Sequence, residues 1–170
     1  MKTTNNKILP FSIFEGYDDG DIGIENKKET VEKLNKLLSN YFILYMKLLN
    51  FHWNIVSKRF NNIHKFFEEL YDKIFENIDS VAERIRIIGG RPISSLEGYL
   101  KNTDLKENTD SDVPDVDKMI EEILYDYETI IKEIRDYLSD DLDNGTSKFL
   151  EDLIEAHEKD AWMLRSNLEN

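Results

Sequence analysis

Cysteine is absent from the 170 residues of this chain, which excludes disulfide bonds and thiolate metal sites and fits a reducing compartment. Long hydrophobic runs are also absent. A membrane-spanning helix needs about 20 mostly apolar residues, whereas the run ILPFSIF at 8–14 is short and interrupted by Pro10. This run lacks a convincing signal-peptide cleavage site. We therefore expect a cytoplasmic protein that does not enter a membrane.

Positive charge is scarce: 22 Lys and Arg stand against 35 Asp and Glu, for a net charge of −13. Phosphate binding requires clustered Lys and Arg. The first 26 residues do not form a basic tail, because Lys2 and Lys7 are outnumbered by acidic residues. DNA binding is therefore predicted to be weak or absent. We expect residues 1–26 to form an arm that is flexible or docked on a neighbouring subunit, before a single domain at 27–170.

Strand signals and internal repeats are not evident, and apolar residues recur at steps of three and four, as in amphipathic helices. The pattern predicts long helices over about 27–54 and 60–88, a third that has Pro114 in its first turn, and a fourth that ends near Leu168. A short helical turn is expected within the linker 93–110. The candidate capping residues are Asn61 or Asn62, Ser94 or Ser95, and Thr146 or Ser147. The predicted fold class is all-α, a four-helix bundle.

Two of the three histidines lie close to the predicted turn between the first two helices. His52 continues the apolar stripe of the first helix, and His64 lies on the second. Because 55–59 is a short connection, the helices should be antiparallel neighbours and the two imidazoles should lie side by side. A lone histidine on an apolar face is usually a core residue, which is an alternative for His52 and the expectation for His157, in the core or at an interface.

Three carboxylates share one face of the second helix with His64. At about 100° per residue, Glu68, Asp79 and Glu83 all lie within about 100° of His64. Two imidazoles and three carboxylates suit iron or another borderline divalent metal. Taken alone, the pair Asp79 and Glu83 would more often be a solvated helix face.

The axial spacing limits how these ligands can meet. Glu68 and Asp79 lie about 16 Å apart along the helix, so one ion cannot contact both. One outcome is two weak half-sites. The other is a two-fold dimer in which this helix crosses its own copy near Lys73 and completes two equivalent sites. A Glu-x-x-His motif is missing from the sequence, which argues against a di-iron centre buried inside one bundle.

From about Leu34 to Leu168 the chain resembles the Dps family of miniferritins. The resemblance rests on HWN at 52–54, HKFFEELYD at 64–72 and DSVAERIRIIGGRP at 79–92. It implies a ferritin-like four-helix bundle with a short extra helix in the crossover between the second and third long helices. It also implies a homo-oligomer, a dodecamer built from two-fold dimers, which encloses a hollow cavity.

The resemblance further implies a ferroxidase for iron storage and protection against oxidative stress. Fe(II) would be oxidised to Fe(III), preferably by hydrogen peroxide, at centres between subunits, and the ferric mineral would be stored in the shell. Zinc or another divalent metal can substitute for iron. The ligands implied, which are also the catalytic residues, are His52, His64, Glu68, Asp79 and Glu83. Family members often carry Asp where this chain has Glu68, so the longer side chain could change metal occupancy.

Weaker assignments follow from the same resemblance. Trp53 occupies the family's aromatic position beside the centre, although it could equally be a packing anchor at a helix end. The acids Asp140, Asp141 and Asp143 correspond to an iron-entry pore, or else they are solvated helix-capping residues. Two alternative functions stay open: a DNA-binding shell that protects the nucleoid with little catalysis, and a non-catalytic helical oligomer.

Overall fold

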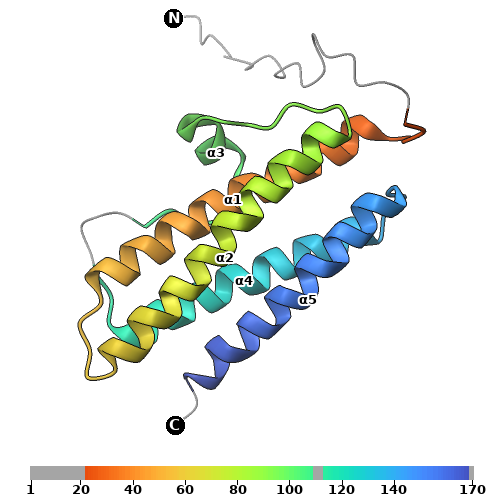
Figure 1. The fold of residues 1–170 in the computed structure, drawn as a ribbon. Helices are drawn as coiled ribbons and strands as arrows, with labels where there is room; N and C mark the ends of the chain where they lie inside the picture. Colours follow the sequence, from red (N-terminus) through yellow and green to blue (C-terminus); the bar gives the residue numbers. More distant parts are fainter. Residues whose placement is uncertain (1–21, 109–112, 169–170) are drawn as a thin grey trace, which may run out of the picture.

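A computed structural model describes residues 22–108 and 113–168, and these residues form five helices and no strand. Figure 1 shows the long helices running side by side, with the short helix lying over α1. The all-α class is confirmed. The helices are α1 (Lys27–Asn54), α2 (Phe60–Ile87), α3 (Leu96–Asn102), α4 (Val116–Leu138) and α5 (Asn144–Ser166).

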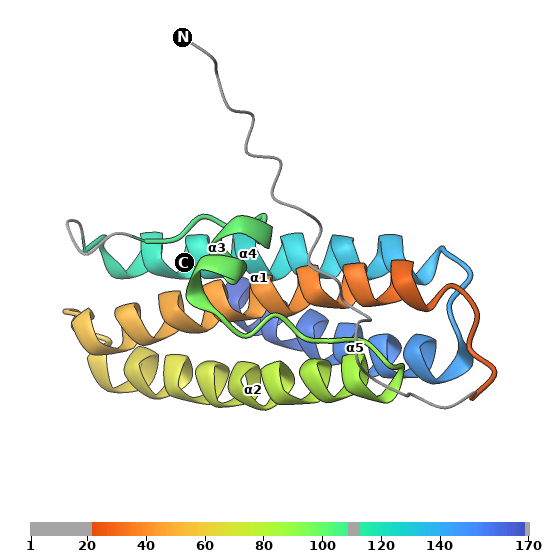
Figure 2. The ribbon, with the colours of Figure 1, turned by 90° about the horizontal axis from the view of Figure 1, so that it is seen from above.

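The bundle consists of two helical hairpins joined by a long crossover. Helices α1 and α2 are connected by residues 55–59, and α4 and α5 by residues 139–143. The crossover carries α3 along the outside of the bundle, as the view from above shows (Figure 2). Stacking of Phe42 on Tyr99, with ring centroids 3.8 Å apart, fixes α3 against α1. Most of the arm expected at 1–26 lies outside the described residues, which include only 22–26 of it.

The apolar stripes of the four long helices meet in one core, as the sequence pattern predicts. Its largest fully buried side chains include Tyr41, Phe51, Phe67 and Tyr127. The ends of α1 and α2 approach closely at Gly90, where a Cβ would lie 2.4 Å from Val31 Cγ2. Only glycine fits at this contact.

Three of the local expectations about helix starts are wrong. Helix α2 begins at Phe60 after Arg59, without a cap from Asn61 or Asn62. Pro114 lies before the first turn of α4, because Asp115 is the N-cap residue. Ser95 caps α3, as one of the two candidates predicted. The prediction for α5 is wrong, because Asp143 caps this helix and not Thr146 or Ser147.

Among the ion pairs between helices, two have a buried carboxylate. Lys47 Nζ of α1 lies 2.6 Å from Asp126 Oδ2 of α4, and both side chains are almost fully buried. Lys73 of α2 pairs at 2.6 Å with Asp160 of α5, whose carboxylate is also buried. Removing one member of a buried pair leaves an uncompensated charge and typically costs about 3–5 kcal/mol.

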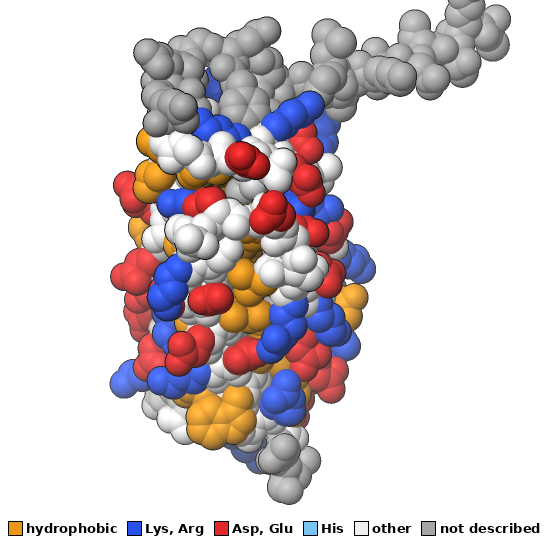
Figure 3. All heavy atoms as spheres, turned by 90° about the vertical axis from the view of Figure 1, so that its right-hand side faces the viewer, with side chains coloured by type: hydrophobic (Ala, Val, Ile, Leu, Met, Phe, Trp, Pro, Cys, Tyr) orange, Lys and Arg blue, Asp and Glu red, His pale blue; other side chains and the backbone are white. Residues whose placement is uncertain are grey.

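The surface carries both signs of charge. Figure 3 shows acidic and basic side chains interspersed on one face, around a band of hydrophobic atoms. Among the described residues, no helix is both long enough and apolar enough to cross a membrane.

Candidate metal centre

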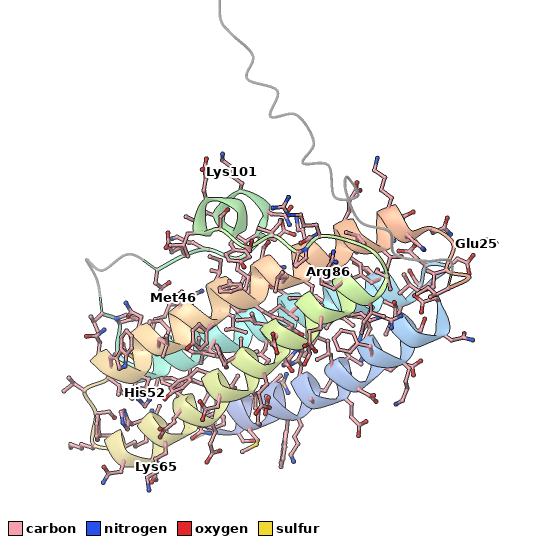
Figure 4. All side chains as sticks on the ribbon, turned by 45° about the horizontal axis from the view of Figure 1, so that its top comes forward. Glu25, Met46, His52, Lys65, Arg86 and Lys101 are labelled. Atoms are coloured by element: carbon pink, nitrogen blue, oxygen red, sulfur yellow. The ribbon has the colours of Figure 1, made fainter. Side chains whose placement is uncertain are left out.

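His52 and His64 lie side by side where α1 ends and α2 begins, as the sequence predicts. Their rings are stacked, with centroids 3.8 Å apart and planes at 18°. Figure 4 shows His52 near this end of the bundle. His52 is 8% exposed and His64 is half-buried.

Each of these histidines is held by the backbone of the other. His52 Nδ1 donates to the carbonyl oxygen of His64 at 2.9 Å, and His64 Nδ1 donates to the carbonyl oxygen of His52 at 3.0 Å. A carbonyl oxygen only accepts, so each Nδ1 must carry a proton. In the neutral ring Nε2 then holds the free lone pair. This tautomer, fixed by a backbone carbonyl, is typical of metal-binding histidines.

Two aromatic residues that sequence reasoning missed surround the histidine pair. Phe60 stacks on His64 with ring centroids 4.8 Å apart, and Tyr71 contacts His52 edge-on at 5.2 Å. Phe60 precedes His64 by one helical turn, and this i, i+4 spacing was the available signal. Tyr71 also hydrogen-bonds to Glu68; burial and then the charges of Glu68 and Asp72 raise the pKa of its phenol.

The carboxylates are divided between the two ends of α2. Glu68 lies one turn after His64, whereas Asp79 and Glu83 are exposed near the other end of the helix. Glu83 follows His64 by 19 residues, a rise of about 28 Å. Accordingly, no three acidic or histidine side chains of the described residues come together at metal-binding distance. Within one chain, the five candidate ligands therefore do not form a single cluster.

Asp79 lies on the edge of an apolar groove between α1, α2 and α3. The groove has a volume of about 730 Å³ and includes Phe42, Phe75, Ile78 and Tyr99 in its lining. Phe75 is 60% exposed in the single chain. An exposed apolar groove of this kind, bordered by acids, is typical of a surface that another protein covers.

The remaining sequence candidates occupy varied environments. Trp53 follows His52 directly but is 67% exposed, so it is not a packed anchor within this chain. The acids after α4 are close in sequence, yet Asp140 pairs with Lys33 and Asp143 pairs with Arg84, each at 2.6 Å. Asp141 is exposed.

Asp143 has a clear structural role. Its carboxylate accepts from the Thr146 backbone N–H at 3.0 Å and from the Thr146 hydroxyl. Burial alone would raise the pKa of the Asp143 carboxyl, but hydrogen bonds from Thr146 and the charge of Arg84 outweigh it and lower the pKa. The capping alternative is therefore realised at Asp143.

His157 lies in the core, as expected, and its Nε2 is 2.6 Å from the Tyr41 hydroxyl. Burial, and then the nearby charge of Lys73, lower the pKa of His157 to about 4. The ring is neutral at pH 7, and its Nε2 already has a partner within the chain.

Comparisons with known proteins identify the family of this chain. Residues 31–170 match the sequence profile of the ferritin-like domain. The chain is 35% identical over 144 residues to DNA protection during starvation protein 2 of Bacillus anthracis, which covers 83% of this chain and 97% of the relative. The chain belongs to the Dps family.

Further similarities extend this Dps assignment. An uncharacterized low temperature-induced protein of Nostoc sp. is 40% identical over 149 residues, which are 85% of this chain and 83% of the relative. The crystal structure of the Dps protein from Vibrio cholerae O1 superposes with a TM-score of 0.80 at 36% identity, over 84% of this chain and 91% of that one. That protein is described as a ferritin-like diiron-carboxylate protein. The ferritin-like four-helix bundle with a short extra helix is confirmed.

Proposed function

We propose that this Dps-family chain is a ferroxidase that oxidises Fe(II) and stores the ferric product in a homo-oligomeric shell. The observation that supports this most directly is the histidine pair. Two backbone carbonyls hold both rings with Nε2 available as a ligand, in a chain whose sequence contains no thiolate alternative. Neutral imidazole and carboxylate oxygen suit iron, and zinc or another divalent metal can occupy the same donors.

We infer that each complete centre forms between two subunits related by a two-fold axis. His52, His64 and Glu68 of one subunit would face Asp79 and Glu83 of its partner, because a rise of about 28 Å along α2 separates His64 from Glu83 of the same chain. A second copy would cover the apolar groove beside Asp79. Such an isologous contact yields two equivalent centres. These dimers are the proposed units of a dodecamer.

The chemistry follows from the donor set. Two Fe(II) supply the two electrons that convert one hydrogen peroxide and two protons into two waters, so hydroxyl radical is not released. Fe(III) is a harder cation than Fe(II) and favours carboxylate oxygens, which helps the product leave the imidazoles for the mineral. Binding requires neutral histidine and ionised carboxylate, so it weakens in acid.

An anaerobic titration of the metal-free protein with Fe(II) tests this function, followed by hydrogen peroxide while ferric absorbance is recorded. Saturable binding and rapid oxidation, with about one peroxide consumed per two irons, are expected from the two-electron balance above. Fast oxidation by oxygen alone would contradict the peroxide preference, and a lack of saturable binding would contradict the ferroxidase assignment.

DNA retention in a gel-shift experiment at low salt would instead favour a nucleoid-protecting shell. The net charge of −13 argues against this outcome, because phosphate binding depends on clustered Lys and Arg.

A further inference from the structure

A polar pair lies in the apolar core of the bundle, away from the candidate ligands. Tyr41 of α1 and His157 of α5 are 0% and 1% exposed, and the phenol oxygen is 2.6 Å from His157 Nε2. Tyr127 of α4 is also fully buried and contacts the same imidazole edge-on, with centroids 5.4 Å apart. Apolar side chains would fill this space without any polar group to satisfy, so the pair invites a chemical explanation.

The protonation states define which atom gives the proton. Because burial lowers the pKa of His157 to about 4, its ring is neutral and Nε2 can accept. Burial also raises the pKa of the Tyr41 phenol well above its usual value, so the phenol keeps its proton. The pair is therefore a phenol O–H directed at a neutral base. Loss of one electron makes a phenol strongly acidic, and its proton can then cross this short hydrogen bond.

A series of aromatic rings extends from the candidate centre toward this pair. His52 contacts Tyr71 at a centroid distance of 5.2 Å, and Tyr71 contacts Tyr45 at 6.2 Å. Tyr45 follows Tyr41 by one turn of α1, so their Cβ atoms are about 5–6 Å apart. The first two steps are ring contacts and the third spans one helical turn, so an electron can cover the path in short steps.

We propose that the Tyr41–His157 pair is a proton-coupled electron donor that takes up single oxidising equivalents arising at the candidate metal centre. This inference rests on the proposed ferroxidase function, which supplies the oxidant. When peroxide meets only one Fe(II), the products are Fe(III), hydroxide and hydroxyl radical.

The Tyr41–His157 pair supplies the electron that hydroxyl radical needs and accepts the proton that is released. Hydroxyl radical gains one electron and becomes hydroxide. That electron leaves Tyr41 through Tyr45 and Tyr71, and the phenol proton moves to His157 Nε2. The products are a neutral Tyr41 phenoxyl radical, a protonated His157 and hydroxide. Because burial penalises the imidazolium, the proton returns to Tyr41 when the radical is later reduced.

The first experiment tests the pair without iron. Full-length, metal-free protein is oxidised by a laser flash with ruthenium tris(bipyridine) and persulfate, and radicals are followed by electron paramagnetic resonance. The chain has eight tyrosines, so variants assign the signal. We expect a long-lived tyrosyl radical that Tyr41→Phe removes. The control Tyr125→Phe, at a side chain 68% exposed, should retain it.

A second variant separates proton acceptance from packing. His157→Gln keeps a hydrogen-bond acceptor near Tyr41 but removes the base, so we expect the radical to decay at least tenfold faster. In heavy water, the radical of the wild type should show a hyperfine coupling to the deuteron transferred to His157, and this coupling should be absent from the variant. Circular dichroism verifies that each variant is folded. An unchanged signal and lifetime in Tyr41→Phe, or an unchanged lifetime in His157→Gln, overturns the inference.

The second experiment supplies the oxidant through iron. Fe(II) is added at one ion per two subunits, hydrogen peroxide follows, and samples are freeze-quenched. We expect the Tyr41 radical in wild type and its loss in Tyr41→Phe, with slower formation in Tyr45→Phe. Iron oxidation with the same radical in Tyr41→Phe overturns the inference alone. No iron oxidation in any sample overturns the proposed function, whatever the flash experiment shows.

Discussion

His52 and His157 are both buried, yet their environments prepare them for opposite roles. At His52 a backbone carbonyl binds Nδ1, and Nε2 is left available for a ligand from outside the ring. At His157 the Tyr41 phenol already occupies Nε2, in the centre of the core. Burial therefore does not distinguish a ligand from a core histidine. The two kinds of histidine differ in which ring nitrogen has a hydrogen-bond partner within the chain.

The largest expected effect on Fe(II) oxidation comes from removing the imidazoles whose Nε2 atoms are available as ligands. Substituting His52 and His64 together with Ala should slow Fe(II) oxidation about 100-fold or more, because both proposed imidazole ligands are lost. Stopped-flow ferric absorbance after peroxide addition measures this. Val56→Ala with Lys65→Ala, two exposed positions at the same end of the bundle, is the control and should keep the wild-type rate. A wild-type rate in the double histidine variant would contradict the assignment of His52 and His64 as iron ligands.

The second prediction concerns the stability that depends on His157. Its pKa is about 4 in the folded chain against a usual value of 6.5, so between these values the unfolded chain binds more protons. The contribution of His157 is fully present above pH 6.5 and is lost as the pH falls toward 4. Between pH 7 and pH 4.5, we expect about 2–3 kcal/mol of acid destabilisation from this residue.

Urea unfolding of wild type and His157→Gln at both pH values measures this difference. The variant should lose less stability in acid, since it has no imidazole to protonate. Comparing the two proteins removes the contributions of carboxylates such as Asp143, which both share. Equal acid losses in the two proteins would contradict the buried neutral state of His157.

A smaller effect is expected at Phe60, which stacks on His64. Phe60→Ala removes one face of the support for that ring, so apparent Fe(II) affinity should fall about threefold, less than for loss of a hydrogen-bonded partner. Anaerobic titration measures the affinity, and Phe60→Tyr should restore it. The exposed Val56→Ala is the control. If Phe60→Ala binds Fe(II) as tightly as wild type, the carbonyl hydrogen bonds alone orient the ring.

The smallest expected effect is at the acids proposed to admit iron. Lys33 and Arg84 neutralise Asp140 and Asp143, so Asp141 is the carboxylate that can attract Fe(II) over distance. Asp141→Asn should slow oxidation at low iron about twofold at low salt, with no difference at high salt. Initial rates measured at several ionic strengths check this. A rate that is equally reduced at every ionic strength would indicate a structural effect instead.

The sequence predicts the helices and the histidine pair because both depend on periodicity and a short connection. The apolar steps give α1 and α2 to within one residue, and equal distances from the turn bring His52 and His64 together. The reciprocal hydrogen bonds to backbone carbonyls could not be predicted, since they depend on how the two helices rotate against each other.

Tertiary contacts explain the wrong prediction for the start of α5. Thr146 and Ser147 have good cap propensity, but Arg84 reaches from α2 to hold Asp143, which then caps the helix. Similarly, the spacing of Lys47 and Asp126 gives no indication that they form a buried ion pair. Such partners are distant in the chain, whereas propensity describes only local preference.

The separation of His64 from Glu83 along α2 has a consequence for the timing of the chemistry during biosynthesis. If the centre is shared as proposed, a newly made chain that has not met its partner cannot oxidise iron rapidly. Reactive intermediates would then arise only after assembly has enclosed them. The rise of about 28 Å between His64 and Glu83 along α2 would act as a safeguard that ties catalysis to completed quaternary structure.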